Sequence, residues 1–370
     1  QDLRTGIDYW IVPTKNDDWL NGVSTADIIK IQKHILGKAV FSNALDMIAA
    51  DVNKSRSITT ADVAELRKLI LGITEEISKN TSWRMMNEGM RFNGVENALE
   101  ETLLEDCEIK DLQTDRKESF TGIKIGDLTN NARPRGFKPT KIETRSQHVL
   151  DLNVENKRLL ANQVYDIDLG SHNIAAFQGF QTTIEFDPQQ VEILEVIANQ
   201  DINLGSEHIN HLAQHRGMIP ISWNGEVQAS SNNKQIMRIR VRTKSDTRVS
   251  DCIRIGSSIT QSLSVDKEGE EGNVQMRFYE PDPDQFILLQ NEPNPWRQST
   301  TIGMILPERG EVTLILYDAT GRVYYKQVML LEKGFNDLTI YRSDVIKPGL
   351  YYYQADYSTS TKTFKMVMVE

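Results

Sequence analysis

The sequence predicts a multidomain, mainly β protein with one small α-helical calcium module near its beginning. Three observations support this. The stretch Asp51–Asp62 alternates oxygen-bearing side chains and is followed by a helical pattern. Short apolar runs with a period of two fill most of residues 142–370. The chain has 370 residues, too many for one ordinary core, which suggests two to four domains.

Composition narrows the class of protein. The net charge of −10 argues against a general nucleic-acid binder and suits a surface protein that uses calcium. No apolar run approaches the ~18–20 residues of a membrane span. The chain opens on Gln-Asp-Leu without a signal peptide, so we expect a processed chain or a segment of a longer one. Cys107 and Cys252 define neither a disulfide scaffold nor a zinc site, and whether they pair is open.

The loop at residues 51–62 has the ligand spacing of a calcium site. Oxygen side chains fall at positions 1, 3, 5 and 12, namely Asp51, Asn53, Ser55 and Asp62. The Ser57 carbonyl at position 7 and a water held by Thr59 at position 9 would complete the shell. The helical pattern that follows ends at Gly72. The alternative is a helix whose N-cap only resembles a set of ligands.

An internal repeat precedes this loop. Residues 22–37 superpose on residues 57–72 at an offset of 35, and each copy has a hydroxyl N-cap, an acid three residues later and a terminal glycine. The first loop is degraded: Leu20 stands at position 5, while positions 1, 3 and 12 carry Asn16, Asp18 and Asp27. We expect weak, altered or absent calcium binding there, and capping without metal is equally open.

The segments around this module are assigned from their patterns. Residues 1–14 predict one strand closed by Pro13, expected to be the last strand of an upstream β domain, and residues 15–78 hold the repeat. Residues 79–141 predict an extended tail over the helices and, from 128 to 141, a turn-rich linker.

Residues 142–279 predict a β-sandwich. The expected strands are short, and several alternate strictly: 149–154, 165–169, 179–186, 191–196, 218–223, 236–241 and 274–278. Between them, His208, His211 and His215 have a spacing that could hold a metal on a helix, but a polar loop is the favoured interpretation. No group of acids and no Ser/His/Asp or Cys/His set indicates catalysis, so we expect no enzyme activity in this chain.

Residues 280–370 predict a second, Ig-like β-sandwich. Its expected strands are 301–306, 312–317, 322–331, 336–341, 349–357 and 362–369, after a short run at 286–296. Turns are expected at Asp318–Gly321 and Lys347–Gly349.

Two of these segments resemble known families. The duplicated loop–helix resembles a type I dockerin, and the segments 80–84 and 120–127 resemble the tail of dockerin-like repeats in secreted Bacteroidetes proteins. The run Ala176–Pro188, together with Ile221–Asn224 and the strand containing Arg238, resembles a cohesin domain. The presence of a dockerin-like and a cohesin-like segment in one chain implies a contact between them. The helix face around Ile28, Lys33, Val63 and Arg67 would dock on the cohesin-like sheet, within one chain or between chains.

The C-terminal unit resembles the type A C-terminal sorting domain of the Bacteroidetes type IX secretion system. The resemblance rests on residues 289–295, 317–322, 348–352 and 365–370, with Trp296 where Phe is usual. It implies an export signal recognised by the outer-membrane translocon, passed to a shuttle barrel and removed by a sortase. Cleavage is expected near residues 279–285.

These interpretations together predict the non-catalytic C-terminal region of a large secreted, cell-surface protein, exported across the outer membrane. Calcium would be its ion and a permanent structural clamp, because calcium is abundant outside cells. Two alternatives remain open. The chain could be the accessory tail of a secreted protease or glycoside hydrolase with an upstream catalytic domain, or the membrane-proximal end of a repetitive adhesin or gliding filament.

Overall fold

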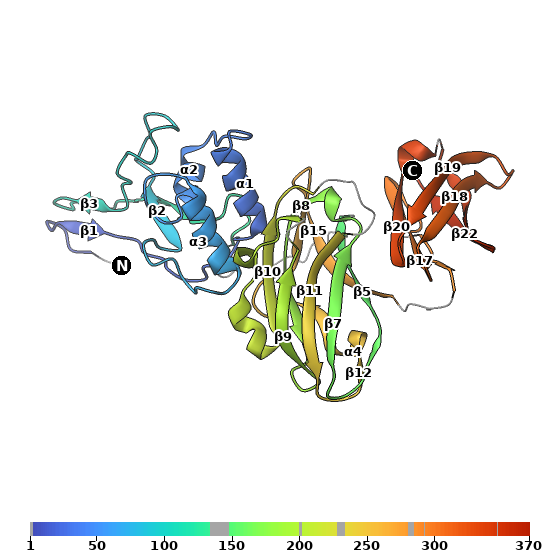
Figure 1. The fold of residues 1–370 in the computed structure, drawn as a ribbon. Helices are drawn as coiled ribbons and strands as arrows, with labels where there is room; N and C mark the ends of the chain where they lie inside the picture. The colour runs from blue at the N-terminus through green and yellow to red at the C-terminus, as the bar shows by residue number, and fades with distance from the viewer. Residues whose placement is uncertain are drawn as a thin grey trace.

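The computed structural model describes residues 3–133, 148–199, 202–227, 234–279, 285–291, 293–345 and 347–370. Three units follow one another along the chain: a helical unit, a large β-sandwich and a C-terminal β unit (Figure 1). Most of the linker expected up to residue 141 and most of the cleavage region near 279–285 lie outside the described residues.

The helical unit contains α1 (Thr25–Ile35), α2 (Ala44–Ala50) and α3 (Thr60–Ile70). Helices α1 and α3 begin with the same capping box, in which a hydroxyl N-cap and the acid three residues later satisfy each other's backbone N–H groups. The apolar stripes of the two helices pack in one core, with Ile28, Ile31, Leu66 and Ile70 fully buried. The predicted repeat of capped helices is therefore present.

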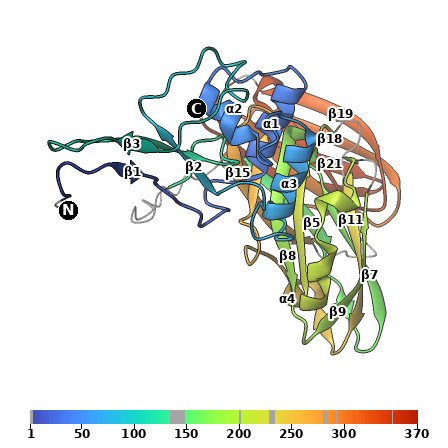
Figure 2. The same ribbon diagram turned by 90° about the vertical axis from the view of Figure 1, so that its left-hand side faces the viewer.

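The segments around the helices pair with each other. Strand β1 (Tyr9–Ile11) pairs with β3 (Cys107–Ile109), and β2 (Trp83–Asn87) pairs with β4 (Phe120–Lys124). Figure 2 shows β1 and β3 side by side, with β2 between them and the helices. The strand expected within residues 1–14 thus takes its partner from the tail of this chain. The tail also enters the helical core through Met86, Leu103 and Ile123, so it is not simply extended over the surface.

The β-sandwich has the strand order β10-β8-β14-β15-β5-β7-β11-β9, with β13 also on β8. All seven predicted strands form, as β5 (Val149–Glu155), β7 (Val164–Ser171), β8 (Phe177–Phe186), β9 (Val191–Ala198), β10 (Met218–Asn224), β11 (Lys234–Thr243) and β15 (Glu271–Tyr279). Four short strands were not predicted: β6 (Arg158–Leu159), β12 (Thr247–Arg248), β13 (Ile253–Gly256) and β14 (Leu263–Asp266). Inward-facing side chains such as Phe180 and Trp223 form one core.

The C-terminal unit places two sheets around a second β core. One sheet has the order β16-β17-β20 and the other β19-β18-β21-β22. The strands are β16 (Ile287–Leu288), β17 (Ser299–Leu306), β18 (Gly310–Asp318), β19 (Val323–Leu331), β20 (Gly334–Tyr341), β21 (Gly349–Tyr357) and β22 (Ser360–Met368). Strands β17 to β22 match the six predicted strands within two residues at each end, and β16 lies within the short run expected before them. Trp296 and Tyr353 are fully buried between the sheets.

The sandwich meets the C-terminal unit at a buried histidine. Nδ1 of His172 lies 2.8 Å from Oδ2 of Asp337 in β20, and its Nε2 lies 3.4 Å from Oδ2 of Asp151 in β5. Arg277 also pairs with Asp151, at 2.8 Å. Burial disfavours the imidazolium, but the two carboxylates outweigh it and raise the pKa of His172 to about 9. A charged His172 therefore connects the two units.

This connection should weaken in mild alkali. Because the folded pKa of His172 is raised, its contribution to stability is complete below the unfolded value near 6.5 and is lost as the pH rises towards 9. The wild type should therefore be more stable than His172→Gln at low pH. This difference in the free energy of unfolding should decrease by about 3 kcal/mol between pH 6.5 and pH 9. Urea unfolding at several pH values measures it. The exposed His211→Gln serves as the control, and a pH-independent difference for His172→Gln would contradict the role.

Candidate functional site

The second loop brings its five predicted calcium ligands together. Oδ1 and Oδ2 of Asp51 accept hydrogen bonds from the backbone N–H groups of Ser55 (2.8 Å) and Arg56 (2.9 Å). Asp62 accepts from the N–H groups of Asn53 (3.1 Å) and Thr59 (2.9 Å), and the Ser55 hydroxyl donates to the Ser57 carbonyl at 3.1 Å. Carboxylate, hydroxyl and carbonyl oxygens therefore converge from both ends of the loop.

Two further observations fit a hard cation in this loop. Oδ1 of Asn53 is buried and accepts no hydrogen bond from the described residues, which leaves an unused ligand oxygen at position 3. Lys54 and Arg56 have φ of +56° and +66°. A left-handed backbone is costly for a residue with a side chain, so the tight bend is held by the surrounding contacts. The residues present fit calcium, which prefers such oxygen donors.

The first loop does not gather its three predicted residues in the same way. Oδ1 of Asn16 accepts a hydrogen bond from the backbone N–H of Ser82 at 2.8 Å. Asp27 is fully buried, and its Oδ1 accepts from the N–H groups of Leu128 (2.7 Å) and Thr129 (2.9 Å). Asp18 has φ of +46°, at a bend of the chain. The neighbours of Asp27 therefore come from the tail.

Helix α1 also lies against the outer face of β8 and β10. The Thr25 backbone N–H donates to Oε1 of Gln181 at 2.6 Å, and its hydroxyl is 2.8 Å from that of Ser222. Gln181 and Ser222 alternate with the core residues Phe180 and Trp223, so their side chains point away from the sandwich core. They are nevertheless buried, because α1 covers them.

The centre of this contact is apolar and close. Ala26 and Ile29 of α1 form a small buried cluster with Leu263 and Val265 of β14. A Cβ added to Gly179 in β8 would lie 2.8 Å from Cδ1 of Ile29. A side chain at that position would push the helix away, so glycine permits the close approach.

The C-terminal end of α3 completes the contact. Nη2 of Arg67 donates to Oδ1 of Asn224 at 2.5 Å, and the amide of Asn224 donates to Gln32 of α1. The Asn210 amide donates to the Leu71 carbonyl at 2.9 Å. Burial, with the Arg67 guanidinium nearby, lowers the pKa of His208 to about 4 and keeps this ring neutral beside the arginine.

The helix face that we expected to dock requires correction. Arg67 does contact the sheet, but Ile28 and Val63 pack inside the core of the helical unit. The contact is made instead by Thr25, Ala26, Ile29 and Gln32, on the face of α1 next to the one that carries Ile28. The expectation drawn from the resemblance chose Ile28 and Val63, which the core of the helical unit buries, whereas the docked residues are mostly small or polar.

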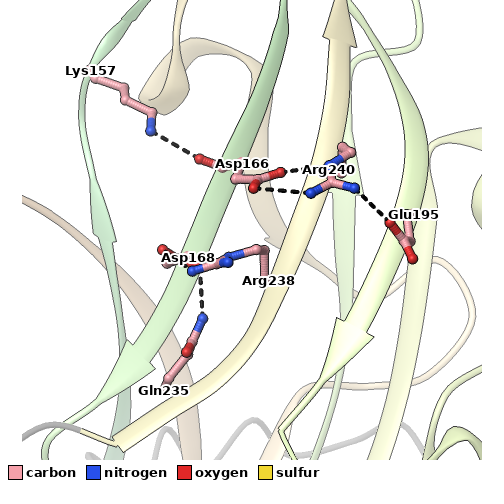
Figure 3. A network of polar contacts seen from close by, with 7 residues as sticks. All are labelled: Lys157, Asp166, Asp168, Glu195, Gln235, Arg238 and Arg240. Carbon is pink, nitrogen blue, oxygen red and sulfur yellow. Dashed lines mark hydrogen bonds and ion pairs between the residues drawn. The ribbon is translucent and has the colours of Figure 1, made fainter.

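The outward face of β7, β11 and β9 has a different character. Cross-strand ion pairs link Arg238 to Asp168 at 2.6 Å, and Arg240 to both Asp166 at 2.9 Å and Glu195 at 3.0 Å (Figure 3). Each exposed pair contributes little to stability. Because the charges satisfy each other, this face does not indicate a charged ligand.

The other sequence features indicate no further chemistry. His208 is buried at the interface with its Nδ1 accepting from the Gly205 N–H at 3.1 Å, while His211 and His215 are exposed. No three His, Cys, Asp or Glu side chains gather for a metal within the described ranges. Cys107 and Cys252 are separate free thiols.

In the C-terminal unit, the motif near residues 289–296 contacts the motif at the end of the chain. The backbone N–H of Trp296 donates to the Val367 carbonyl at 2.9 Å, and the Val369 N–H donates back to the Trp296 carbonyl at 2.8 Å. Oδ1 of Asn294 accepts from the N–H of Val367 at 2.9 Å. The Tyr353 hydroxyl donates to the Leu289 carbonyl at 2.8 Å. The segment 289–296 is thus held against the closing strand β22 and its neighbour β21.

No helix in the described part of the chain is long and apolar enough to span a bilayer. No family model and no curated protein matches the chain. Among solved structures it is similar to the type I cohesin–dockerin complex Coh-OlpC–Doc435 of Clostridium thermocellum, with 18% identity and a TM-score of 0.26, covering 36% of this chain and 96% of that one. It is also similar to a type II cohesin of Acetivibrio cellulolyticus, with 12% identity and a TM-score of 0.25, covering 35% and 92%.

Proposed function

We propose that this chain is a non-catalytic, architectural region of an exported cell-surface protein. In it, a calcium-clamped, dockerin-like helical unit packs on the cohesin-like sandwich of the same chain, and residues 280–370 form the sorting domain. The observation that carries the architectural part is the contact of α1 with β8 and β10, where the polar side chains of Gln181 and Ser222 are buried and paired across the two units.

The chemistry of that contact supports a specific interface. A buried hydroxyl or amide without a partner costs about 1–3 kcal/mol, so polar groups are rarely covered unless the opposing surface matches them. Here Thr25, Gln181 and Ser222 match across the contact, around the apolar cluster that includes Ile29. The two units are therefore expected to keep one relative position.

Calcium in the second loop would support this arrangement from within the helical unit. The ion would be held by the side chains of Asp51, Asn53, Ser55 and Asp62 and the Ser57 carbonyl. It would supply positive charge between two acidic groups. Burial raises the pKa of Asp62, and the Asp51 carboxylate adds to this, so the loop without a cation has an electrostatic cost.

The interface can be tested at Ser222. In Ser222→Arg, a guanidinium would have to be buried against Thr25 without a partner, while the sandwich core remains untouched. A penalty of ~1.4 kcal/mol lowers the docked fraction of a marginal contact about tenfold. Crosslinking of lysines between the helical unit and the sandwich, read by mass spectrometry, measures the loss. Ser245→Arg, at an exposed position, is the matched control. Unchanged crosslinks in Ser222→Arg would contradict the proposed interface.

The calcium clamp can be tested by melting. For the wild type, calcium at 100 times its Kd should stabilise the helical unit by about 2.7 kcal/mol, because the ion binds the folded loop only. Asp51→Asn should remove most of the stabilisation attributable to the second loop. The control is Glu65→Gln, which alters a surface ion pair of α3. A chelator that leaves the wild-type melting temperature unchanged would rule out the clamp.

The sorting role is tested by fusion. A periplasmic reporter that carries residues 280–370 should reach the cell surface in a type IX-competent host. The same fusion without residues 360–370 lacks β22, which holds the 289–296 segment, and should be retained. Surface labelling of the reporter measures export. Retention of the intact fusion in the periplasm would contradict the assignment.

A further inference from the structure

Residues Asp127–Ala132 of the tail repeat the first half of the calcium loop. Asp-Leu-Thr-Asn-Asn-Ala aligns with Asp-Val-Asn-Lys-Ser-Arg at residues 51–56, with oxygen side chains at the first, third and fifth positions of both. The second residue is buried in the helical core in both copies, as Leu128 and Val52. The fourth residue is left-handed in both, with φ of +57° at Asn130 and +56° at Lys54.

The hydrogen bonds of the leading aspartate are the same in both copies. Asp127 accepts from the N–H groups of Asn131 (3.3 Å) and Ala132 (2.9 Å), four and five residues later. Asp51 accepts from the N–H groups four and five residues later as well, at 2.8 and 2.9 Å. Both segments therefore fold as the same half-loop.

Residues 127–132 contact the start of α1 in the same way as residues 51–56 contact the start of α3. Oδ1 of Asp27 accepts from the N–H of Thr129 at 2.9 Å, and its Oδ2 accepts from the N–H of Ser24 at 2.8 Å. In the second loop, Oδ1 and Oδ2 of Asp62 accept from the corresponding residues, at 3.1 and 2.9 Å. The end of the half-loop also lies next to the residues before α1. A Cβ added to Gly22 would lie 2.5 Å from the backbone nitrogen of Ala132.

Charge provides evidence that is independent of loop shape. Asp27 is fully buried and Asp127 is 6% exposed, and neither carboxylate forms an ion pair in the part of the chain that is described. The nearby Lys124 ammonium donates instead to the carbonyls of Trp19 (2.8 Å) and Ile125 (3.4 Å). Two buried carboxylates without an ion-pair partner among the described residues favour a bound positive ion.

We propose that Asp127, Thr129, Asn131 and Asp27, with the carbonyl of Gly22, form a second site for a divalent cation of the calcium class. Its loop is split: positions 1 to 6 come from residues 127–132 and positions 7 to 12 from residues 22–27. In this assignment Asp127 and Thr129 take the place of Asn16 and Asp18 at positions 1 and 3 of the calcium loop that precedes α1. It rests on the proposed calcium binding of the second loop only for the identity of the ion.

Counting bound ions on the full chain tests the split site. Isothermal titration with calcium should give two ions for the wild type and one each for Asp127→Asn and Asp51→Asn. The exposed Asp115→Asn is the matched control and should keep two. Asn131→Ala changes an exposed side chain and should weaken calcium binding at the split site about tenfold. This variant tests the split site even if Asp127→Asn does not fold.

The outcomes separate the two proposals. One ion in the wild type, lost in Asp51→Asn but kept in Asp127→Asn, overturns the split site and leaves the second loop. One ion lost only in Asp127→Asn supports the split site and overturns the clamp. Two ions with loss of one in Asp18→Asn rather than in Asp127→Asn overturns the split site in favour of residues 16–27. No bound ion overturns both.

Discussion

A buried carboxylate requires donors for its oxygens, and Asp27 meets this requirement by joining two parts of the chain, the start of α1 and the tail. It closes the N-terminus of α1 through Ser24, and it holds residues 128 and 129 of the tail through their N–H groups. The adjacent Thr25 and Ala26 contact the sandwich. The positions of the tail, the helix and the sheet thus depend on a single turn of α1.

The regular elements were largely predictable because their signals are local. Capping hydroxyls and terminal glycines predicted α1 and α3, and the period of two predicted the long strands of both β units. The short strands β6, β12, β13 and β14 were missed, because two to four residues are too few for a period to be recognised.

The interface and the partners of Asp27 could not be predicted in the same way. Gln181 and Ser222 follow the alternation that places polar residues on a solvated face, and only the fold shows that α1 covers them. The tail segment at 127–132 carries the same spacing of oxygens as the second loop, which is a readable signal. Sequence reasoning misses it because a loop is expected to precede its helix, and here its second residue, Leu128, lies 101 residues after the capping acid.

The position of that segment in the chain has a consequence for the order of folding. The hydrogen bonds from Leu128 and Thr129 to Asp27 span 101 and 102 residues, among the longest separations in the helical unit. Closing so long a chain segment is slow, because the entropy is lost before the contacts form. A chain that emerges from its N-terminal end can form α1 and its capping box early, but Oδ1 of Asp27 lacks these two donors until the whole tail has followed.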